Sequence, residues 1–148
     1  MEQIIERIIK LKNKINLFKN MEDKDIRLIL KDIKFVGYQT GETIIKEGDT
    51  SDELYILLDG KCKVNVGTTN VGVIEVNQAF GEFSAITKSP RHATIRALKP
   101  CKVISFKIAF DILEKELKGF SILYKNFVDE LILKVDATNL EKRKGTFV

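Results

Sequence analysis

Two charged residues near the middle of the chain have the chemistry to bind a small anion that carries a sugar. Glu82 follows Gly81 at the start of a short turn, and Arg91 stands nine positions later, ahead of a strand of alternating apolar residues. The guanidinium of an arginine presents a planar fork of donors that fits phosphate oxygens. A carboxylate repels phosphate, so Glu82 is suited to accept hydrogen bonds from ribose hydroxyls or to orient Arg91. The pair predicts a site for a phosphorylated nucleoside.

The residues between this pair favour the same ligand. Gly81 permits unusual backbone dihedrals and a close approach of the ligand, and residues 82–86 can form one helical turn. The first amides of such a turn have no partner inside the helix and favour a phosphate. Two plainer interpretations stay open. Gly81 alone would also suit a tight turn, and Glu82 and Arg91 could form a buried ion pair that only holds a loop.

The run from 80 to 97 resembles the phosphate-binding cassette of cyclic nucleotide-binding domains. These are the modules of cAMP-dependent protein kinase regulatory subunits, catabolite activator proteins and cyclic-nucleotide-gated channels. The resemblance rests on Gly-Glu-Phe-Ser at 81–84 and Pro-Arg-His-Ala-Thr at 90–94. Residues 38–49 and 52–60 resemble the two upstream strand signatures of the family, in the usual order and at the usual distances. The resemblance covers roughly residues 18 to 127.

The resemblance implies a role for each matching residue. Glu82 would bind the ribose 2'-hydroxyl, Arg91 would bind the cyclic phosphate, and the backbone amides of Phe83 and Ser84 would complete the phosphate cradle. Ala93 would lie beside the sugar and the phosphate. The implied ligand is cAMP or cGMP, with no further cofactor, and the expected site comprises Phe80, Gly81, Glu82, Phe83, Ser84, Pro90, Arg91, His92 and Ala93.

Two positions depart from the family pattern. Residues 76–79 read Val-Asn-Gln-Ala where the family often has a Gly-Asp pair, which bears on the shape of the approach to the cassette. His92 stands where a small residue usually follows the arginine, and a threonine there is linked to guanine preference. We therefore expect cAMP to be favoured over cGMP. His92 itself is either a half-exposed strand residue or a contact to the base.

The elements around the cassette follow from the hydrophobic pattern. Apolar residues recur at helical spacing in 1–33, switch to short runs separated by glycines in 34–107, and return to helical spacing in 108–143. This order predicts an α+β, mainly β, fold. We expect an antiparallel β-roll or jelly-roll barrel, flanked by N-terminal helices and a long C-terminal helix. Gly119 is expected to break the last helical region, so that the long helix runs from 120 to 142.

The long last helix carries more apolar residues than one surface can bury. Leu131, Ile132 and Leu133 are consecutive, and at about 100° per residue they point in three directions. Either the helix end is wedged within its own domain, or it packs on the barrel with one side and on a second subunit with the other. In the family this helix closes over the base and often pairs in dimers. Leu131, Ile132 and Val135 are the lid candidates.

Composition indicates one soluble domain over residues 1–148. The chain is 44% hydrophobic and 31% charged, and its net charge of +4 is spread among acidic residues, so we expect no nucleic-acid partner. The N-terminus has no continuous apolar run, which predicts no membrane partner and a cytoplasmic location. Cys62 and Cys101 are expected to be buried strand thiols, and one histidine is too few for a metal site.

These patterns predict a regulatory binding module without catalytic activity. A cyclic nucleotide would be held by the cassette and capped by the C-terminal helix, which would signal to a downstream protein partner. A homodimer through that helix is a further expectation. The alternative is a ligand-free β-barrel scaffold or interaction domain that oligomerises through its terminal helices. A single histidine gives no Ser/His/Asp or Cys/His arrangement, so an enzyme is the least favoured class.

Overall fold

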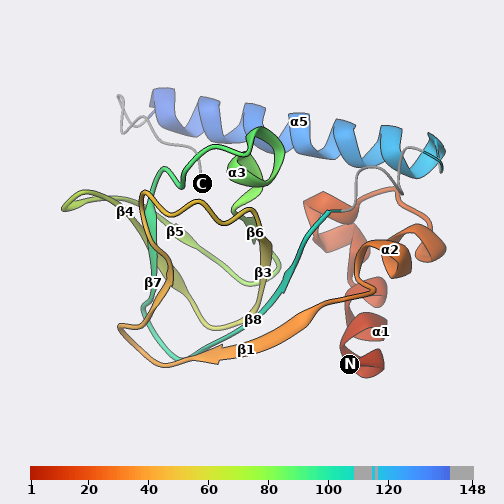
Figure 1. The fold of residues 1–148 in the computed structure, drawn as a ribbon, viewed down its shortest axis with the longest axis horizontal. Coiled ribbons are helices and arrows are strands. Elements are labelled where there is room, and N and C mark those ends of the chain that lie inside the picture. The colour runs from red at the N-terminus through yellow and green to blue at the C-terminus, as the bar shows by residue number, and fades with distance from the viewer. Residues whose placement is uncertain (109–114, 116, 141–148) are drawn as a thin grey trace.

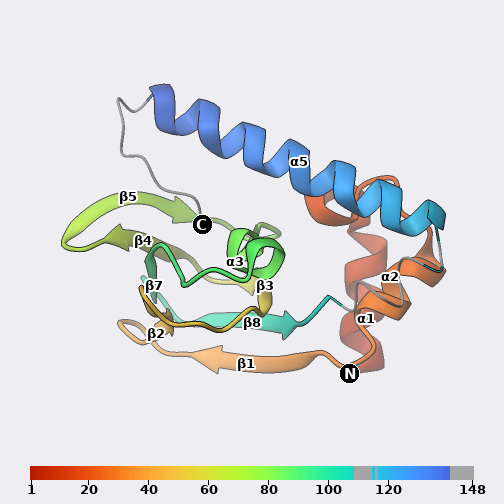
Figure 2. The ribbon, with the colours of Figure 1, turned by 45° about the horizontal axis from the view of Figure 1, so that its top comes forward.

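Two antiparallel sheets and a set of helices form three layers in the computed structural model, which describes residues 1–108, 115 and 117–140 (Figure 1). The helical layer lies against one sheet, and the second sheet lies against the other face of that sheet (Figure 2). The elements before the sheets are α1 (Glu2–Lys10), two 3-10 turns η1 (Lys12–Lys14) and η2 (Asn16–Phe18), and α2 (Asp23–Ile29).

The strands occupy the predicted region, from Lys34 to Phe106, which confirms the expected β-roll. They form two four-stranded sheets that do not close into a barrel, in the orders β1-β8-β3-β6 and β2-β7-β4-β5. Their bounds are β1 (Lys34–Tyr38), β2 (Thr43–Ile45), β3 (Leu54–Asp59), β4 (Cys62–Val66), β5 (Thr69–Ile74), β6 (Ala79–Phe80), β7 (Thr94–Ala97) and β8 (Cys101–Phe106). Helix α3 (Glu82–Thr87) connects β6 to β7, and helix α5 (Leu117–Leu140) is the last element described.

The first sheet buries both of its faces at its central strands. In β3, Leu54, Ile56 and Leu58 pack in the apolar cluster of the helical layer, whereas Tyr55 and Leu57 pack in the cluster between the two sheets. The alternation follows from the period of two in a strand. Strand β8 alternates in the same way. Burial on both faces explains why these strands read as nearly continuous apolar runs.

Helix α5 is attached to the N-terminal helical segment. The side chain of Asn126 is buried, and its Nδ2 donates to the carbonyl oxygens of Leu17 and Lys19, both at 2.9 Å. Leu123 and Phe127 are buried on the same side of the helix. In both ribbon views α5 runs from this attachment across α3 (Figures 1 and 2).

The expected break of the last helical region at Gly119 is wrong. Helix α5 begins at Leu117 and continues through Gly119, so this glycine does not break it. A glycine inside a helix costs only about 1 kcal/mol, which the packing of a long helix easily offsets. The side chain of Val135 and residues 109–114, where helical spacing was expected as part of 108–143, lie outside the described residues. None of the helices in the described part of the chain combines the length and the apolar character needed to cross a membrane.

Candidate functional site

Gly81 stands where no other residue fits without distortion. It precedes α3 in the left-handed region, with φ 85°, and the turn predicted at 82–86 is confirmed as this helix. A Cβ atom added to Gly81 would lie 2.8 Å from Nη1 of Arg91 and 3.0 Å from the carbonyl oxygen of Glu53. Both the dihedral and the contact therefore require glycine, because they let the backbone meet a buried guanidinium.

The guanidinium of Arg91 is fixed by four hydrogen bonds. Nη1 donates to the carbonyl oxygen of Gly81 at 2.9 Å, and Nη2 donates to that of Glu53 at 2.6 Å. Nε and Nη2 both donate to Oγ of Ser51, at 3.3 and 3.2 Å. Arg91 is only 4% exposed, yet the three oxygens that accept these four bonds are all neutral. The carboxylates of Asp49, Asp52 and Glu53 act on the guanidinium through space. A bound anion would add a charged acceptor in direct contact with it.

An aromatic pair lies against the same guanidinium. The carbon Cζ of Arg91 lies 6.0 Å from the ring centroid of Tyr55, which stacks on Phe80 with centroids 5.1 Å apart. Burial lowers the pKa of Arg91 and raises the pKa of Tyr55 to about 12. Both shifts have the same cause, since desolvation disfavours the charged form of each group. Arginine stays protonated at any physiological pH.

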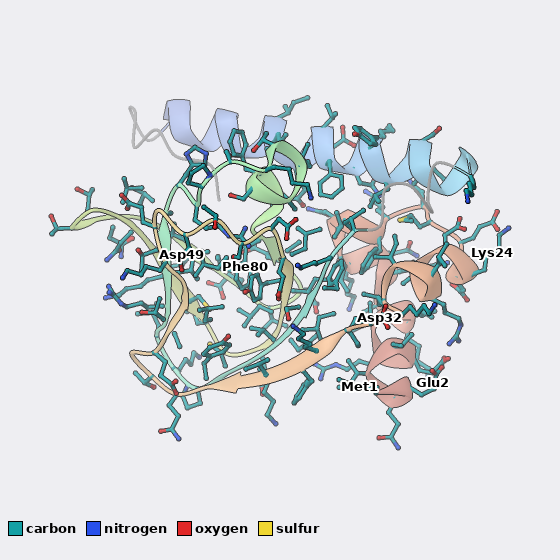
Figure 3. The ribbon with its side chains drawn as sticks, in the orientation of Figure 1. Met1, Glu2, Lys24, Asp32, Asp49 and Phe80 are labelled. Atoms are coloured by element: carbon teal, nitrogen blue, oxygen red, sulfur yellow. The ribbon has the colours of Figure 1, made fainter. Side chains whose placement is uncertain are left out.

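The loop between β2 and β3 also holds the backbone of Arg91. The amide of Arg91 donates to the carbonyl oxygen of Asp49 at 2.7 Å, and the amide of Gly48 donates to the carbonyl oxygen of Arg91 at 2.9 Å. Figure 3 labels Asp49 and Phe80, which lie below α3. Residues 46–53, which we call the β2–β3 loop, therefore bind both the backbone and the side chain of Arg91.

The same loop is linked to the far end of α3. Asp52 accepts a hydrogen bond from Lys88 Nζ at 2.9 Å and lies 3.6 Å from Lys107 Nζ. The hydrogen bond from Lys88 is the main cause that lowers the pKa of Asp52. Lys88 ends α3 in the left-handed region, with φ 58°. Both ends of the cassette helix are thus connected to the β2–β3 loop.

His92 lies on the exposed side of the cassette. It precedes β7 rather than lying in the strand, which corrects the first of the two interpretations of this residue. Its ring packs edge to face on Phe83, with centroids 4.7 Å apart and planes at 79°. Nε2 of His92 lies 3.4 Å from Oγ of Ser89, which in turn is hydrogen-bonded to Thr87 at 2.6 Å. The imidazole is thereby oriented beside the phenylalanine.

A hollow of about 10 Å³ marks the centre of the cassette. Its lining consists of Ile45, Gly81, Phe83, Ser84, Arg91, His92, Ala93 and Ile95. Six of these were predicted, and Ile45 and Ile95 were not. Ligand sites usually enclose roughly 300–1,000 Å³, so the hollow is far smaller than a complete site for a small molecule.

The other predicted residues lie around this hollow rather than in its lining. Phe80 is fully buried, Glu82 is 1% exposed, and Pro90 is exposed. Leu131 and Ile132 are not among the described residues that line the hollow, and Ile132 is 52% exposed.

Sequence reasoning missed the partners of Arg91. Ser51, Glu53 and Tyr55 lie in or beside the segments that resemble the upstream strand signatures, and their proximity to Arg91 was not foreseen. Glu53 acts through its carbonyl oxygen, which every residue has, so its type carried no signal. For Tyr55 a signal existed, because an aromatic residue on the inner face of a strand is placed to pack on a buried cation.

Comparison with known proteins identifies the family to which this chain belongs. The family model described as the cyclic nucleotide-binding domain matches residues 35–109, just over half of the chain. The chain therefore belongs to the cyclic nucleotide-binding domain family. The match runs from the second residue of β1 through the other seven strands and the cassette, so it covers the elements that position Arg91.

Individual relatives are distant in sequence. The chain is 30% identical over 119 residues to a cGMP-dependent protein kinase of Eimeria tenella, which covers 80% of this chain and 12% of the kinase. It is 28% identical over 130 residues to a cAMP-dependent protein kinase regulatory subunit of Yarrowia lipolytica, covering 86% of this chain and 35% of the relative. The chain thus spans a small part of these relatives.

A solved structure confirms the fold. The cyclic nucleotide-binding domain from Methylobacillus flagellatus superposes with a TM-score of 0.80 at 21% identity, covering 99% of this chain and 88% of that chain.

Proposed function

We propose that residues 1–148 act as one regulatory module that binds a cyclic nucleotide without catalysing a reaction. The observation that carries the proposal is the buried guanidinium of Arg91, which is only 4% exposed and is held by neutral oxygens beside Gly81. A cyclic phosphate is a monoanion that would give the guanidinium a charged acceptor in direct contact. Glu82 would accept hydrogen bonds from the ribose, and the amides of Phe83 and Ser84 would bind the phosphate.

Within this proposal cAMP is favoured over cGMP, on the basis of His92. The two curated relatives described above do not decide the matter, since one is named for cGMP and the other for cAMP at nearly equal identity. His92 packs on Phe83 at the rim of the hollow, where it could contact a base. No threonine stands at this position to favour guanine.

The proposed output passes through α5 to a downstream protein partner in the cytoplasm. The cassette helix contributes Ala85 and Ile86 to the apolar cluster that also contains Leu123 and Phe127 of α5. Phe83 and Ser84 of α3 line the hollow, so a nucleotide that widens it would move α3, which shares this cluster with α5. A ligand that binds the rearranged cassette more tightly therefore biases the position of α5.

Ligand binding is tested by thermal unfolding with cAMP, cGMP, 5'-AMP and adenosine, followed by calorimetry. A ligand at about 100 times its dissociation constant adds roughly 2.7 kcal/mol to the free energy of unfolding. We expect stabilisation by the cyclic nucleotides and little by adenosine, which lacks the phosphate. Equal responses to cAMP and adenosine would contradict phosphate recognition.

A second candidate is the ligand-free scaffold that self-associates through its terminal helices. It is favoured by an exposed apolar stripe on α5, formed by Tyr124, Val128 and Ile132 at a spacing of four residues. This stripe also suits the proposed homodimer. If the chain is such a scaffold, it should self-associate to the same extent with and without nucleotide. Sedimentation in the presence and absence of cAMP would measure this.

A further inference from the structure

Ser51 lies where a covalently attached phosphate would meet the guanidinium of Arg91. It is exposed in the β2–β3 loop, and its Oγ accepts from Nε and Nη2 of Arg91 at 3.3 and 3.2 Å. These two nitrogens form one edge of the guanidinium, the kind of edge that binds two oxygens of a phosphate side by side. Ser51 is therefore exposed to solvent, while its hydroxyl is hydrogen-bonded to the buried guanidinium of Arg91.

We propose that Ser51 is a phosphorylation site and that its phosphate competes with the cyclic phosphate for Arg91. The competition rests on the proposed function, whereas binding of the Ser51 phosphate to Arg91 does not. In the modification, Oγ forms a bond to the γ-phosphorus of a nucleoside triphosphate. The bond from that phosphorus to the bridging oxygen breaks, the hydroxyl proton leaves, and a nucleoside diphosphate is released.

The sequence around Ser51 defines the class of kinase. Asp49 precedes it by two positions, and Asp52 and Glu53 follow directly, so the site suits a serine/threonine kinase that prefers acidic substrates. Two of these carboxylates already have lysine partners. Asp52 pairs with Lys88 at 2.9 Å, and Glu53 lies 3.7 Å from Lys34. Their pairing reduces the repulsion that a new phosphate would meet.

The effect of the modification follows from charge. A phosphoserine carries close to two negative charges near neutral pH and presents three acceptor oxygens, whereas the hydroxyl presents one weak acceptor. The phosphate would hold the Nε and Nη2 edge strongly and supply the countercharge that the nucleotide otherwise provides. We expect affinity for cAMP to fall by about 5- to 150-fold, the usual range of coupling between two sites.

The test installs phosphoserine genetically at position 51 of the full chain. The matched control carries phosphoserine at position 68, an exposed residue of the β4–β5 turn. Titration by ³¹P NMR should give a lower second pKa for the phosphate at 51 than at 68, because the guanidinium stabilises the dianion. The difference should shrink in Arg91→Ala. Calorimetry should show weaker cAMP binding only for phosphoserine at 51.

Each outcome decides a separate part of the proposal. Identical ³¹P titrations at 51 and 68 would overturn the contact between the phosphate and Arg91. Equal cAMP affinities of both modified chains and the unmodified chain would overturn the competition. If the unmodified chain binds no cyclic nucleotide, the proposed function fails instead, and the ³¹P titration still decides the contact.

The modification itself is tested with ATP and an acid-directed serine/threonine kinase. Peptide mapping should find one phosphate on the native chain, lost in Ser51→Ala and retained in Thr50→Ala. Incorporation at Thr50, or none in the folded chain, would overturn Ser51 as the modified residue.

Discussion

At the scale of single residues, Arg91 is the one on which ligand affinity should depend most. Replacing it with alanine removes a desolvated charge partner of the phosphate, which costs roughly 2 to 5 kcal/mol. We therefore expect Arg91→Ala to weaken cyclic nucleotide binding by about 30-fold to several thousand-fold in calorimetry. The matched control is Arg96→Ala, since Arg96 is exposed on β7 and its side chain donates only to Thr43 among the hydrogen bonds described. An affinity of Arg91→Ala within about threefold of the native value would exclude this residue from the site.

Glu82 should distinguish a ribose from a deoxyribose. Its carboxylate is buried at the start of α3, close to the backbone that lines the hollow. A 2'-deoxy cyclic nucleotide lacks the hydroxyl that this carboxylate would bind. We expect several-fold weaker binding of the deoxy ligand to the native chain and little difference in Glu82→Ala. If both proteins lose the same affinity, Glu82 serves only the structure of the cassette.

His92 is the residue at which base selectivity can be measured. The imidazole packs on Phe83 at the rim of the hollow and is not buried. A competition titration of the native chain should give tighter binding of cAMP than of cGMP, and His92→Thr should narrow or reverse this order. Tighter cGMP binding by the native chain would refute the preference and leave the fold unaffected.

At the scale of elements, α5 has an attached segment and a following segment with exposed apolar side chains, which we propose responds to ligand. Asn126 and Phe127 fix the helix on the segment around η2, whereas Val128 and Ile132 are about half exposed. Removal of residues 131–148 leaves this attachment intact. We expect the trimmed chain to bind cyclic nucleotide more weakly and to keep its unfolding transition, as measured by calorimetry and circular dichroism.

Hydrogen exchange supplies an independent measure of the same element. Nucleotide should slow amide exchange in 131–135 as well as in the cassette from 81 to 93. Protection confined to the cassette, together with equal binding by the trimmed and full chains, would reject α5 as a lid.

The sequence predicted elements better than it predicted contacts. The strand region and the long last helix follow from periodicity, which reflects burial of one face at a time. The cassette helix was expected instead from Gly81 and the turn that can follow it. The break expected at Gly119 was wrong because a glycine costs a helix only about 1 kcal/mol. That cost is too small to end a long helix that packs on the rest of the domain. The partners of Arg91 could not be predicted in full, since Gly81 and Glu53 act through carbonyl oxygens. The small volume of the hollow likewise depends on side-chain packing that no pattern encodes.

At the scale of the whole molecule, the thiol pair gives stability a defined pH dependence. Cys62 and Cys101 are buried in β4 and β8, as predicted, with their sulfurs 3.6 Å apart. Burial, with the hydrogen bond to Cys101 as a lesser cause, raises the pKa of Cys62 from 9.0 to about 12. The unfolded chain therefore releases this proton at lower pH than the folded chain does.

Alkaline conditions should for that reason favour unfolding. The contribution of Cys62 to the free energy of unfolding is complete below pH 9 and is lost as the pH rises toward 12. Urea unfolding of the native chain should show this loss, and Cys62→Ala should show less of it between these pH values. If the free energy of unfolding depends on pH in the same way for both proteins, the Cys62 thiol has the same pKa in the folded and the unfolded chain.

The two-faced packing of β3 has a consequence for divergence among relatives. Leu54, Ile56 and Leu58 must fit whatever helices lie against them, while Tyr55 and Leu57 must fit the second sheet and the aromatic stack beside Arg91. Substitutions on one face are compensated by different neighbours from substitutions on the other. In homologous sequences, Leu54, Ile56 and Leu58 should therefore covary with the helices. Tyr55 and Leu57 should covary with the second sheet. The residues facing the helices can then change with new packing partners, while the residues facing the second sheet and Arg91 stay constrained.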